Sequence, residues 1–404
     1  MRVKLAIIAA LYFAQGFPYG AFAELLPTFL RFQGVDLAEI TELTARLGLA
    51  WTLKFLWAPL VDQIGTRRSW ILGAQLLLAA SLASIALLQP TSATPAVWIA
   101  LGALTFLSAT QDIAIDAYGI ELLEEREYGA ANGVRVAAYR VALIATGGLL
   151  VATAGRTGWT VAFWIATGVM LLMAAITLFL PNPDVKRHAA PAAGLLERTV
   201  WHPLRTLAVL PGFAALLLFV MTFKMGDFAL LVLIRPFWVD SGYSPEAIGL
   251  VLGTVGMLAT IGGALLGGAL TTRWGIFHAL WILGLTQAFS NLGYYLAAVQ
   301  GASVGVMYTA AIVEQFTNGL GTAAFLAFLM ALCDRRFAAT QYALLTAIYG
   351  LGRFLVMDQA GALAQSVGYE TYFLITLALA FPAFLLLPWV RRAMEARRER
   401  SPVP

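Results

Sequence analysis

Long apolar stretches separated by short polar ones repeat along the whole chain. A helix that crosses a membrane needs about 20 consecutive, mostly apolar residues. Glycine and proline occur inside several of these stretches, which membrane helices tolerate. The first stretch is too long for a signal peptide and lacks a cleavage-site pattern, so we expect it to be retained. The pattern predicts twelve spans: 5–31, 39–61, 69–89, 95–119, 133–154, 159–181, 208–232, 245–270, 276–299, 303–331, 339–362 and 369–390.

The composition agrees with a membrane protein. The 404 residues are 60% hydrophobic and 12% charged, whereas soluble domains carry about 25% charged residues; the mean hydropathy is +0.79. Disordered chains, coiled coils and secreted disulfide scaffolds are excluded, the last because Cys333 is the single cysteine. The net charge of +4 is not interpreted as nucleic-acid binding, because positive charge in a membrane protein first reports its orientation.

The lysines and arginines are distributed unevenly between the two sides of the predicted membrane. With the N-terminus inside, the opposite side holds little beyond Arg31, Arg46, Arg156 and Arg235. The positive-inside rule then places both termini in the cytoplasm, because the number of spans is even. The cytoplasmic segments hold Arg2, Lys4, Arg67, Arg68, Arg126, Lys186, Arg187, Arg198, Arg205, Arg273, Arg335, Arg336, Arg391, Arg392, Arg397, Arg398 and Arg400.

The longest polar stretch lies between the sixth and seventh predicted spans. It contains four prolines, Pro181, Pro183, Pro191 and Pro203, and a basic cluster around Lys186. We therefore divide the chain into a six-helix half at 1–181, a cytoplasmic linker at 182–207, a second six-helix half at 208–390 and a basic tail at 391–404. Two six-helix halves joined by a cytoplasmic linker are typical of the major facilitator fold, so we expect an all-α integral membrane protein of that fold.

The loop between spans two and three carries a recognisable motif. It reads Asp62-Gln63-Ile64-Gly65-Thr66-Arg67-Arg68, and a second short basic turn occurs at the equivalent place in the other half, at 271–275. The first resembles the superfamily's Asp-Arg-x-Gly-Arg-Arg signature, from which Gln63 and Thr66 depart. We expect a gating latch formed by Asp62, Gly65, Arg67 and Arg68; the alternative is an ordinary positive turn.

Charged residues inside the predicted spans are the candidates for function. A charge inside a membrane helix is costly and is usually retained for a role, although each could also belong to a structural ion pair. These residues are Glu24, Lys54, Asp112, Asp116, Arg135, Arg140, Lys224, Asp227, Glu314, Arg353 and Asp358.

The superfamily resemblance implies that helices 1, 4, 7 and 10 line a central cavity. Asp112 and Asp116 on helix 4 are four residues apart and share a face, and Glu314 and Asn318 on helix 10 have the same spacing. Lys224 and Glu314 both fall near the membrane midplane, where such transporters bind their substrates, and we expect them to face each other. The predicted substrate-binding residues are Gln15, Tyr19, Gln111, Lys224, Asp227, Glu314 and Asn318.

Depth along the helices suggests partners for the helix 4 aspartates. At a rise of 1.5 Å per residue, Asp116 lies about 5 Å and Asp112 about 10 Å from the inner end of helix 4. Arg135 and Arg140 on helix 5 lie at similar depths, so we expect Asp116 to face Arg135 and Asp112 to face Arg140. Lys54 is also near the depth of Asp112. Asp112, with Asp116 and Arg140, is the predicted proton-coupling group.

Three segments resemble one particular family of transporters. The sequence SATQDIAIDAY at 108–118 resembles the helix 4 signature shared by AmpG-type muropeptide permeases and acetyl-coenzyme A transporters. LKFLWAPLVD at 53–62 is similar to helix 2 of the same group, and QGFPY at 15–19 to its helix 1. The stretch from Glu121 to Asn132 also fits. The close resemblance covers the first third of the chain, and the second half agrees in topology and charge placement.

The resemblance implies proton-driven import of anhydro-muropeptides across a bacterial inner membrane, by a multi-pass symporter working through alternating access. Acetyl-coenzyme A or another large anionic solute is the alternative substrate, and export of siderophores or drugs within the same superfamily is a further alternative. The superfamily also implies a monomer. Gly249/Gly253 and Gly263/Gly267 allow close helix contacts, which serve either internal packing or dimerisation.

Enzymes and receptors fit the sequence less well. His188, His202 and His278 have neither metal-ligand spacing nor a plausible nucleophile beside them, so we expect no catalytic residues, no metal and no cofactor. No phosphate-binding loop precedes a helix, which argues against ATP-driven transport. The chain also lacks room for a soluble sensor domain. The predicted partners are an anionic small molecule, protons and the lipid bilayer.

Overall fold

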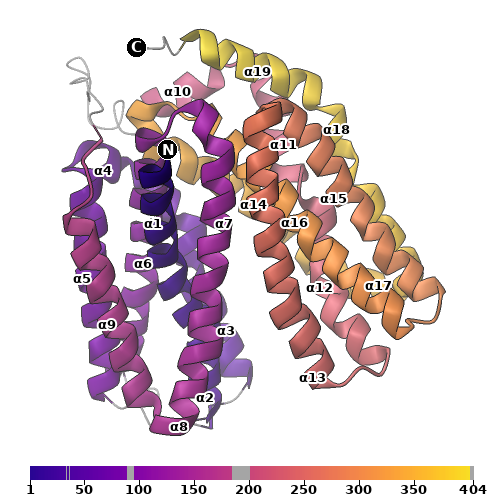
Figure 1. Ribbon diagram of the computed structural model, residues 1–404, viewed down its shortest axis with the longest axis horizontal. Helices are drawn as coiled ribbons and strands as arrows, with labels where there is room; N and C mark the ends of the chain where they lie inside the picture. The colour runs from indigo at the N-terminus through magenta and orange to yellow at the C-terminus, as the bar shows by residue number, and fades with distance from the viewer. Residues whose placement is uncertain (33, 36, 89–94, 184–200, 401–404) are drawn as a thin grey trace. The chain divides into compact units, whose positions relative to one another are not determined.

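The computed structural model describes residues 1–32, 34–35, 37–88, 95–183 and 201–400, and every regular element in these ranges is helical (Figure 1). In the first part of the chain the helices are α1 (Arg2–Gly20), α2 (Leu26–Phe32), α3 (Leu37–Leu53), α4 (Ala58–Gln63), α5 (Arg67–Leu88), α6 (Pro95–Leu122), α7 (Tyr128–Ile144), α8 (Val151–Thr157) and α9 (Trp159–Leu178). In the second part they are α10 (His202–Ala208), α11 (Phe213–Thr222), α12 (Met225–Asp240), α13 (Pro245–Ile248), α14 (Gly256–Trp274), α15 (Ile276–Val299), α16 (Val304–Leu332), α17 (Ala338–Ala380), α18 (Pro382–Leu385) and α19 (Leu387–Arg400).

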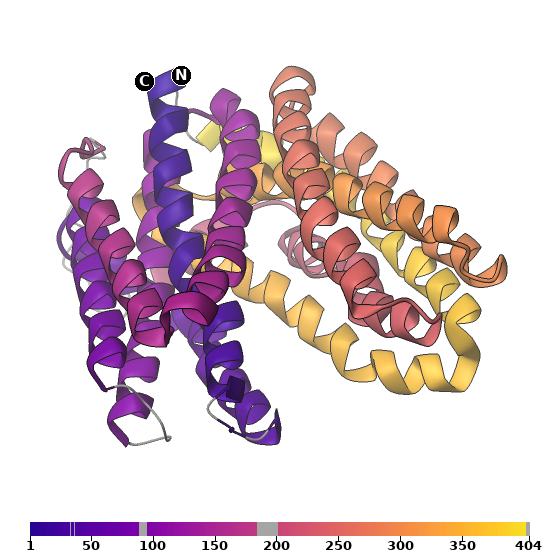
Figure 2. The same cartoon turned by 60° about the horizontal axis from the view of Figure 1, so that its bottom comes forward.

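Short segments of altered helical winding join several of these helices. The π-helical segments Ala21–Leu25, Ala145–Leu150 and Gly249–Val255 connect α1 to α2, α7 to α8 and α13 to α14. The 3₁₀ segment Lys54–Leu56 connects α3 to α4. Helix α17 is bent (Figure 2) at Gly368, whose φ of +77° lies in the region that glycine favours.

Nine helical segments within the described ranges are long and apolar enough to cross a membrane. They begin at Arg2, Arg67, Trp98, Glu125, Trp159, Phe213, Glu246, Val304 and Gln359. The first eight each overlap one predicted span, and the ninth covers most of 369–390 and the end of 339–362. The other three predicted spans, 39–61, 276–299 and 339–362, coincide with α3 and α4, with α15, and with the first part of α17. The count of twelve therefore stays a prediction, and so does the placement of both termini in the cytoplasm.

The chain forms two compact units. Unit 1 contains residues 1–123, 138–203 and 335–343, and unit 2 contains 124–137, 204–334 and 344–404. Each unit thus includes a short segment from the other side of the predicted linker. Of that linker, residues 184–200 lie outside the described residues, and its end forms the start of α10. The predicted tail continues as α19 to Arg400, and 401–404 lie outside the described residues.

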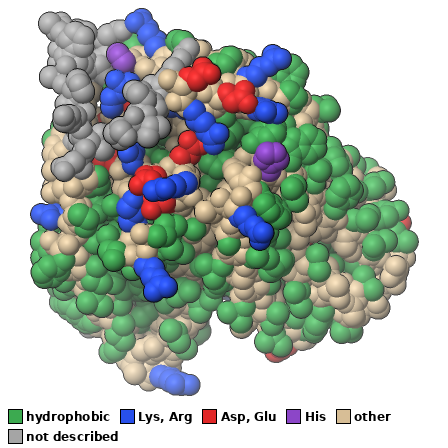
Figure 3. Space-filling model, turned by 45° about the horizontal axis from the view of Figure 1, so that its top comes forward, with side chains coloured by type: hydrophobic (Ala, Val, Ile, Leu, Met, Phe, Trp, Pro, Cys, Tyr) green, Lys and Arg blue, Asp and Glu red, His purple; other side chains and the backbone are tan. Residues whose placement is uncertain are grey.

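Each unit has its own apolar core. In unit 1, α5 packs beside α6 and α9 (Figure 1), and the core includes Phe22, Leu82 and Met170. In unit 2, Trp238, Tyr294 and Phe373 from α12, α15 and α17 pack together. Large hydrophobic side chains also cover much of the outer surface (Figure 3). Apolar surface of that extent is expected where a protein meets lipid rather than water.

Glycines bring α14 and α16 into backbone contact. A β-carbon at Gly267 would lie 2.6 Å from the carbonyl oxygen of Leu320, and one at Gly319 would lie 2.7 Å from the backbone nitrogen of Ala264. Gly263 is similarly close to the backbone of Phe316. The Gly263/Gly267 spacing therefore serves packing within unit 2. A β-carbon at Gly249 or Gly253 would meet nothing within 4 Å among the described atoms.

We expect Gly319→Ala to destabilise the protein by about 1–3 kcal/mol, the usual cost of overpacking, because the obstructing atoms belong to the backbone of α14. Gly253→Ala is the matched control, since its new methyl group meets no neighbour. Thermal unfolding of the purified protein in detergent measures both. Equal melting temperatures for the two variants would show that α14 and α16 separate at little cost.

Candidate functional site

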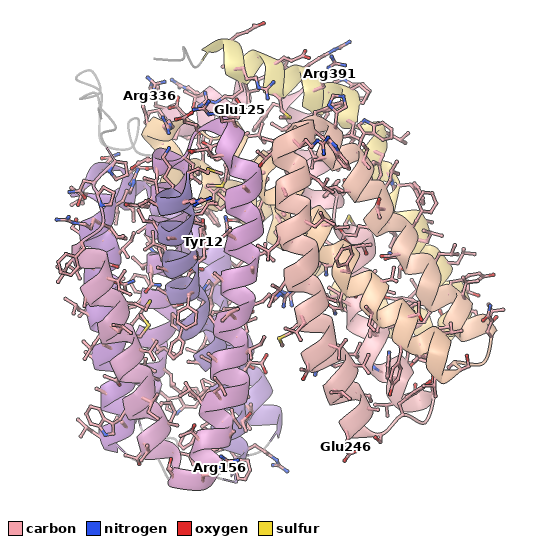
Figure 4. All side chains as sticks on the ribbon, in the orientation of Figure 1. Tyr12, Glu125, Arg156, Glu246, Arg336 and Arg391 are labelled. Carbon is pink, nitrogen blue, oxygen red and sulfur yellow. The ribbon has the colours of Figure 1, made fainter. Side chains whose placement is uncertain are left out.

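Unit 1 contains a buried cluster of charged and polar side chains on α1, on the 3₁₀ segment after α3 and on α6. The Lys54 Nζ lies 3.9 Å from Asp112 Oδ2 and 3.8 Å from Asp116 Oδ2. The hydroxyl of Tyr12, labelled in Figure 4, donates to Asp116 Oδ1 at 3.0 Å. All three charged side chains are buried. One lysine therefore lies between two carboxylates whose spacing along α6 had placed them on one face.

Lys54 reaches these aspartates because the second predicted span, 39–61, is broken beside it, between α3 and α4. α3 ends at Leu53, and Lys54 begins the 3₁₀ turn that leads to α4. Pro59 follows at the start of α4; proline lacks the N–H that would continue the helical hydrogen bonds and so favours such a break. The altered winding carries Lys54 into the bundle, where it is 8% exposed.

The expected partner of Asp112, Arg140, is half-buried on α7, and Lys54 is the cation that the structure places beside Asp112. The expected pairing of Asp112 with Arg140 stays a prediction. The depth argument had placed Lys54 near Asp112, and the structure confirms that the two are close. The expected pairing of Asp116 with Arg135 stays a prediction.

Helix 1 contributes Gln15 and Tyr19 to the same unit. Gln15 is buried, and the Tyr19 ring packs against Trp51 and Tyr139 with centroids 5.1 and 5.9 Å away. Gln111 of α6 donates its Nε2 to the carbonyl oxygen of Ala14 at 2.7 Å. That carbonyl lacks its usual helical donor, because the residue four positions later is Pro18. Gln111 thus connects α6 to α1. Its role toward substrate stays a prediction.

Unit 2 contains a second buried charged cluster, located at the break between α11 and α12. The predicted span 208–232 corresponds to α11 and α12, which extend to Asp240 and are separated at Phe223 and Lys224. Lys224 is 2% exposed. Its Nζ lies 3.2 Å from Asp227 Oδ2 and 2.6 Å from Gln287 Oε1 on α15.

Two neutral side chains complete this cluster. The Gln287 amide nitrogen donates to Asp227, and the Lys224 Nζ also lies 3.3 Å from Asn318 Oδ1 on α16. Asn318 was predicted from the sequence, whereas Gln287 was not, because α15 was not expected to reach the cluster. A glutamine inside an apolar span was the available signal. Glu314 is buried one turn before Asn318, and its pairing with Lys224 stays a prediction.

The loop between α4 and α5 forms a third cluster, in unit 1. Arg67 is buried, and its guanidinium lies 2.6 Å from Asp62 Oδ1 and 2.7 Å from Glu121 Oε1. Gly65, with φ of +66°, forms the turn between the two helices. Arg68 donates to the carbonyl oxygen of Leu180 at 2.9 Å. The motif residues therefore fix this loop to the end of α6, at Glu121, and to Leu180 just after α9.

Asp62 also holds a segment far along the chain. Its carboxylate accepts from the backbone N–H of Ala339 at 3.1 Å, and from the N–H of Thr340 at 2.8 Å and its hydroxyl. These N–H groups lie at the start of α17, where helical donors have no partner within their own helix. Arg335 reinforces the contact by donating to the carbonyls of Ile120 and Glu121 at the end of α6. The contacts that Thr340, Glu121 and Arg335 make with this loop and with the end of α6 were not predicted from the sequence.

Comparison with known proteins places these clusters in context. A sequence profile of the Major Facilitator Superfamily matches residues 8–357. The chain is 35% identical over 404 residues to the anhydromuropeptide permease of Escherichia coli (strain K12), with 98% of this chain and 81% of that protein covered. It is 28% identical to the putative transporter AmpG 4 of Rickettsia conorii (strain ATCC VR-613 / Malish 7), covering 96% of each chain.

A solved structure shows the same fold at lower identity. The proton:xylose symporter XylE, bound to 6-bromo-6-deoxy-D-glucose, superposes with a TM-score of 0.71 at 13% identity, covering 95% of this chain and 94% of that one. This likeness concerns the fold alone. Together with the profile match and the curated relatives, it confirms the expected superfamily and favours a transporter over an enzyme.

Proposed function

Because the chain belongs to the major facilitator superfamily, whose members are membrane transporters, we propose that this protein imports anhydro-muropeptides in symport with protons. The observation that carries the proposal is the 35% identity to the E. coli anhydromuropeptide permease across 98% of the chain. The sequence motifs at 15–19, 53–62 and 108–118 indicate the same family. The import direction and the proton coupling are part of the proposal.

We further propose that the protein works by alternating access in a bacterial inner membrane, as a monomer with twelve spans and cytoplasmic termini. The bacterial relatives support the location. The abundance of Lys and Arg on one set of predicted loops supports the orientation. Proton coupling is assigned to Asp112, with Asp116 and Arg140, in unit 1. The Lys54 ammonium, which lies beside both carboxylates, supports the assignment.

The loop cluster of Asp62, Gly65, Arg67 and Arg68 is proposed as a latch. Asp62 connects the loop to residues 339–340 at the start of α17, far along the sequence. A latch must be made and broken during each transport cycle. Hydrogen bonds from one carboxylate to the end of a helix suit that requirement, because they can be exchanged as a group.

Uptake into proteoliposomes tests the proposed substrate and coupling together. We expect an inward-directed proton gradient, with the outside more acidic, to drive accumulation of a labelled anhydro-muropeptide. The accumulation reaches up to about tenfold per pH unit for each coupled proton, since one pH unit is equivalent to about 1.4 kcal/mol. Acetyl-coenzyme A and a siderophore are compared in the same vesicles. Accumulation of either of these in place of the muropeptide would overturn the substrate assignment, and uptake indifferent to the pH gradient would overturn proton symport.

A further inference from the structure

The Lys224 ammonium contacts acceptors on two sides. Asp227 and Gln287 are buried, and they also bind each other through the Gln287 amide. Asn318 is half-buried, and its contact with the ammonium, at 3.3 Å, is the longest of the three. Asn318 is neutral and is therefore the acceptor that an incoming anion would replace most easily. The cluster has a rear side, formed by Asp227 and Gln287, and an accessible side at Asn318.

Gln287 is held in one position by its surroundings. A β-carbon at Gly321 would collide with its side-chain oxygen and lie 3.1 Å from its amide carbon, so the glycine leaves the space that the amide fills. The amide oxygen accepts from Lys224, and the amide nitrogen donates to Asp227. Gln287 therefore keeps the ammonium and the carboxylate together whatever binds on the Asn318 side.

The charges around Asp227 can be named for each helix that packs against it. Lys224 lies directly before α12, the helix that carries Asp227. α15 presents Gln287 and Ala288, and the ends of α17 and α18 present Ala380 and Phe384, none of which ionises. α16 presents Asn318, with the acidic Glu314 one turn away. Asp227 therefore supplies the carboxylate that neutralises Lys224 within this buried cluster.

We propose that Lys224 binds a carboxylate of the solute from the Asn318 side and that Asp227 takes up a proton as this happens. Without that proton, two carboxylates would share one ammonium in a buried site, and an uncompensated buried charge is strongly disfavoured. Asp227 also lines a small pocket with Phe223, Gly284 and Phe384. The lining of this pocket includes neither Lys224 nor Asn318, so the pocket gives the carboxylate a separate face on which to receive the proton.

The consequence is that anion and proton bind together. This inference rests on the proposed proton symport and adds a proton-binding site in unit 2; uphill uptake requires both this site and Asp112, so that loss of either one abolishes it. If one proton is linked to binding, the dissociation constant of an anionic solute rises about tenfold per pH unit while Asp227 is ionised in the free protein. A solute without a carboxylate does not show this dependence.

The proposal is tested by counting protons taken up when an anhydro-muropeptide binds to the purified full-length protein in weakly buffered detergent solution. The wild type is expected to take up about one proton per solute at Asp227. Asp227→Asn is expected to lose this uptake and to bind with a pH-independent affinity. Asp240→Asn, the same change on the same helix outside the cluster, is the matched control, and Glu314→Gln tests the other nearby acid.

Each outcome of this experiment decides the proposal. Unchanged proton uptake in Asp227→Asn overturns it, as does a loss confined to Glu314→Gln. If Asp227→Asn fails to fold because Lys224 keeps its charge, Lys224→Gln combined with Asp227→Asn removes both charges, and retained proton-linked binding in that variant also overturns the proposal. Failure of the substrate assignment looks different: the wild type then does not bind the muropeptide at all, whereas failure of this proposal leaves muropeptide binding in place without proton uptake at Asp227.

Discussion

Asp112→Asn is expected to abolish uphill uptake driven by a pH gradient while leaving exchange of solute across the membrane in place. Asparagine keeps the size and the hydrogen-bonding oxygen of the aspartate but cannot carry a proton to the other side. The Lys54 ammonium, 3.9 Å away, is the cation placed to stabilise the ionised form of Asp112. Movement of Lys54 during the transport cycle would then switch Asp112 between its two protonation states.

The measurement compares accumulation after a pH step with counterflow exchange, in the same proteoliposomes. Asp112→Asn should reach no more than the external concentration of solute, whereas the wild type gains up to about tenfold per pH unit and coupled proton. Asp116→Asn distinguishes the two carboxylates, because Asp116 also accepts from Tyr12 and is expected to act as a structural partner. An Asp112→Asn protein that still concentrates solute after a pH step would remove Asp112 from the coupling mechanism.

The sequence predicted those parts of the site that depend on spacing within one helix. The four-residue spacing of Asp112 and Asp116 is sufficient to place them on one face of α6, and both contact Lys54. Long apolar runs likewise predicted the helices, because about 20 apolar residues leave few alternatives to a membrane span. Such properties are local and need no knowledge of the neighbouring helices.

The features that were missed depend on breaks in helices and on distant partners. Arithmetic at 1.5 Å per residue assumes a straight helix, so it could not show the 3₁₀ turn at Lys54. The break at Lys224 likewise lets Gln287 of α15 reach it. The contact between Asp62 and residues 339–340 joins positions more than 270 residues apart in the chain, and no pattern within one sequence reports such a pairing.

Asp62→Asn is expected to reduce transport about tenfold or more without preventing membrane insertion, because it removes charge-assisted hydrogen bonds worth about 1.5–3 kcal/mol each. Asp62 is surrounded by donors: Arg67, the N–H groups of Ala339 and Thr340, and the Thr340 hydroxyl. A carboxylate can accept from all of them, whereas one side of an asparagine amide is itself a donor and would face another donor. The remaining pair of Arg67 and Glu121 should keep the loop folded.

Two further variants show whether the transport defect arises from this contact. Thr340→Val removes one hydroxyl and leaves the backbone N–H in place, so we expect a smaller loss than for Asp62→Asn. Glu395→Gln disrupts the exposed ion pair with Arg391 and should leave the rate unchanged, since exposed pairs contribute about 0–1 kcal/mol. Initial uptake rates, normalised to the amount of protein in the membrane, give the order of the three. If Asp62→Asn transports at the wild-type rate with the same pH profile, the loop takes no part in the transport cycle, and its buried ion pairs serve only to fold unit 1.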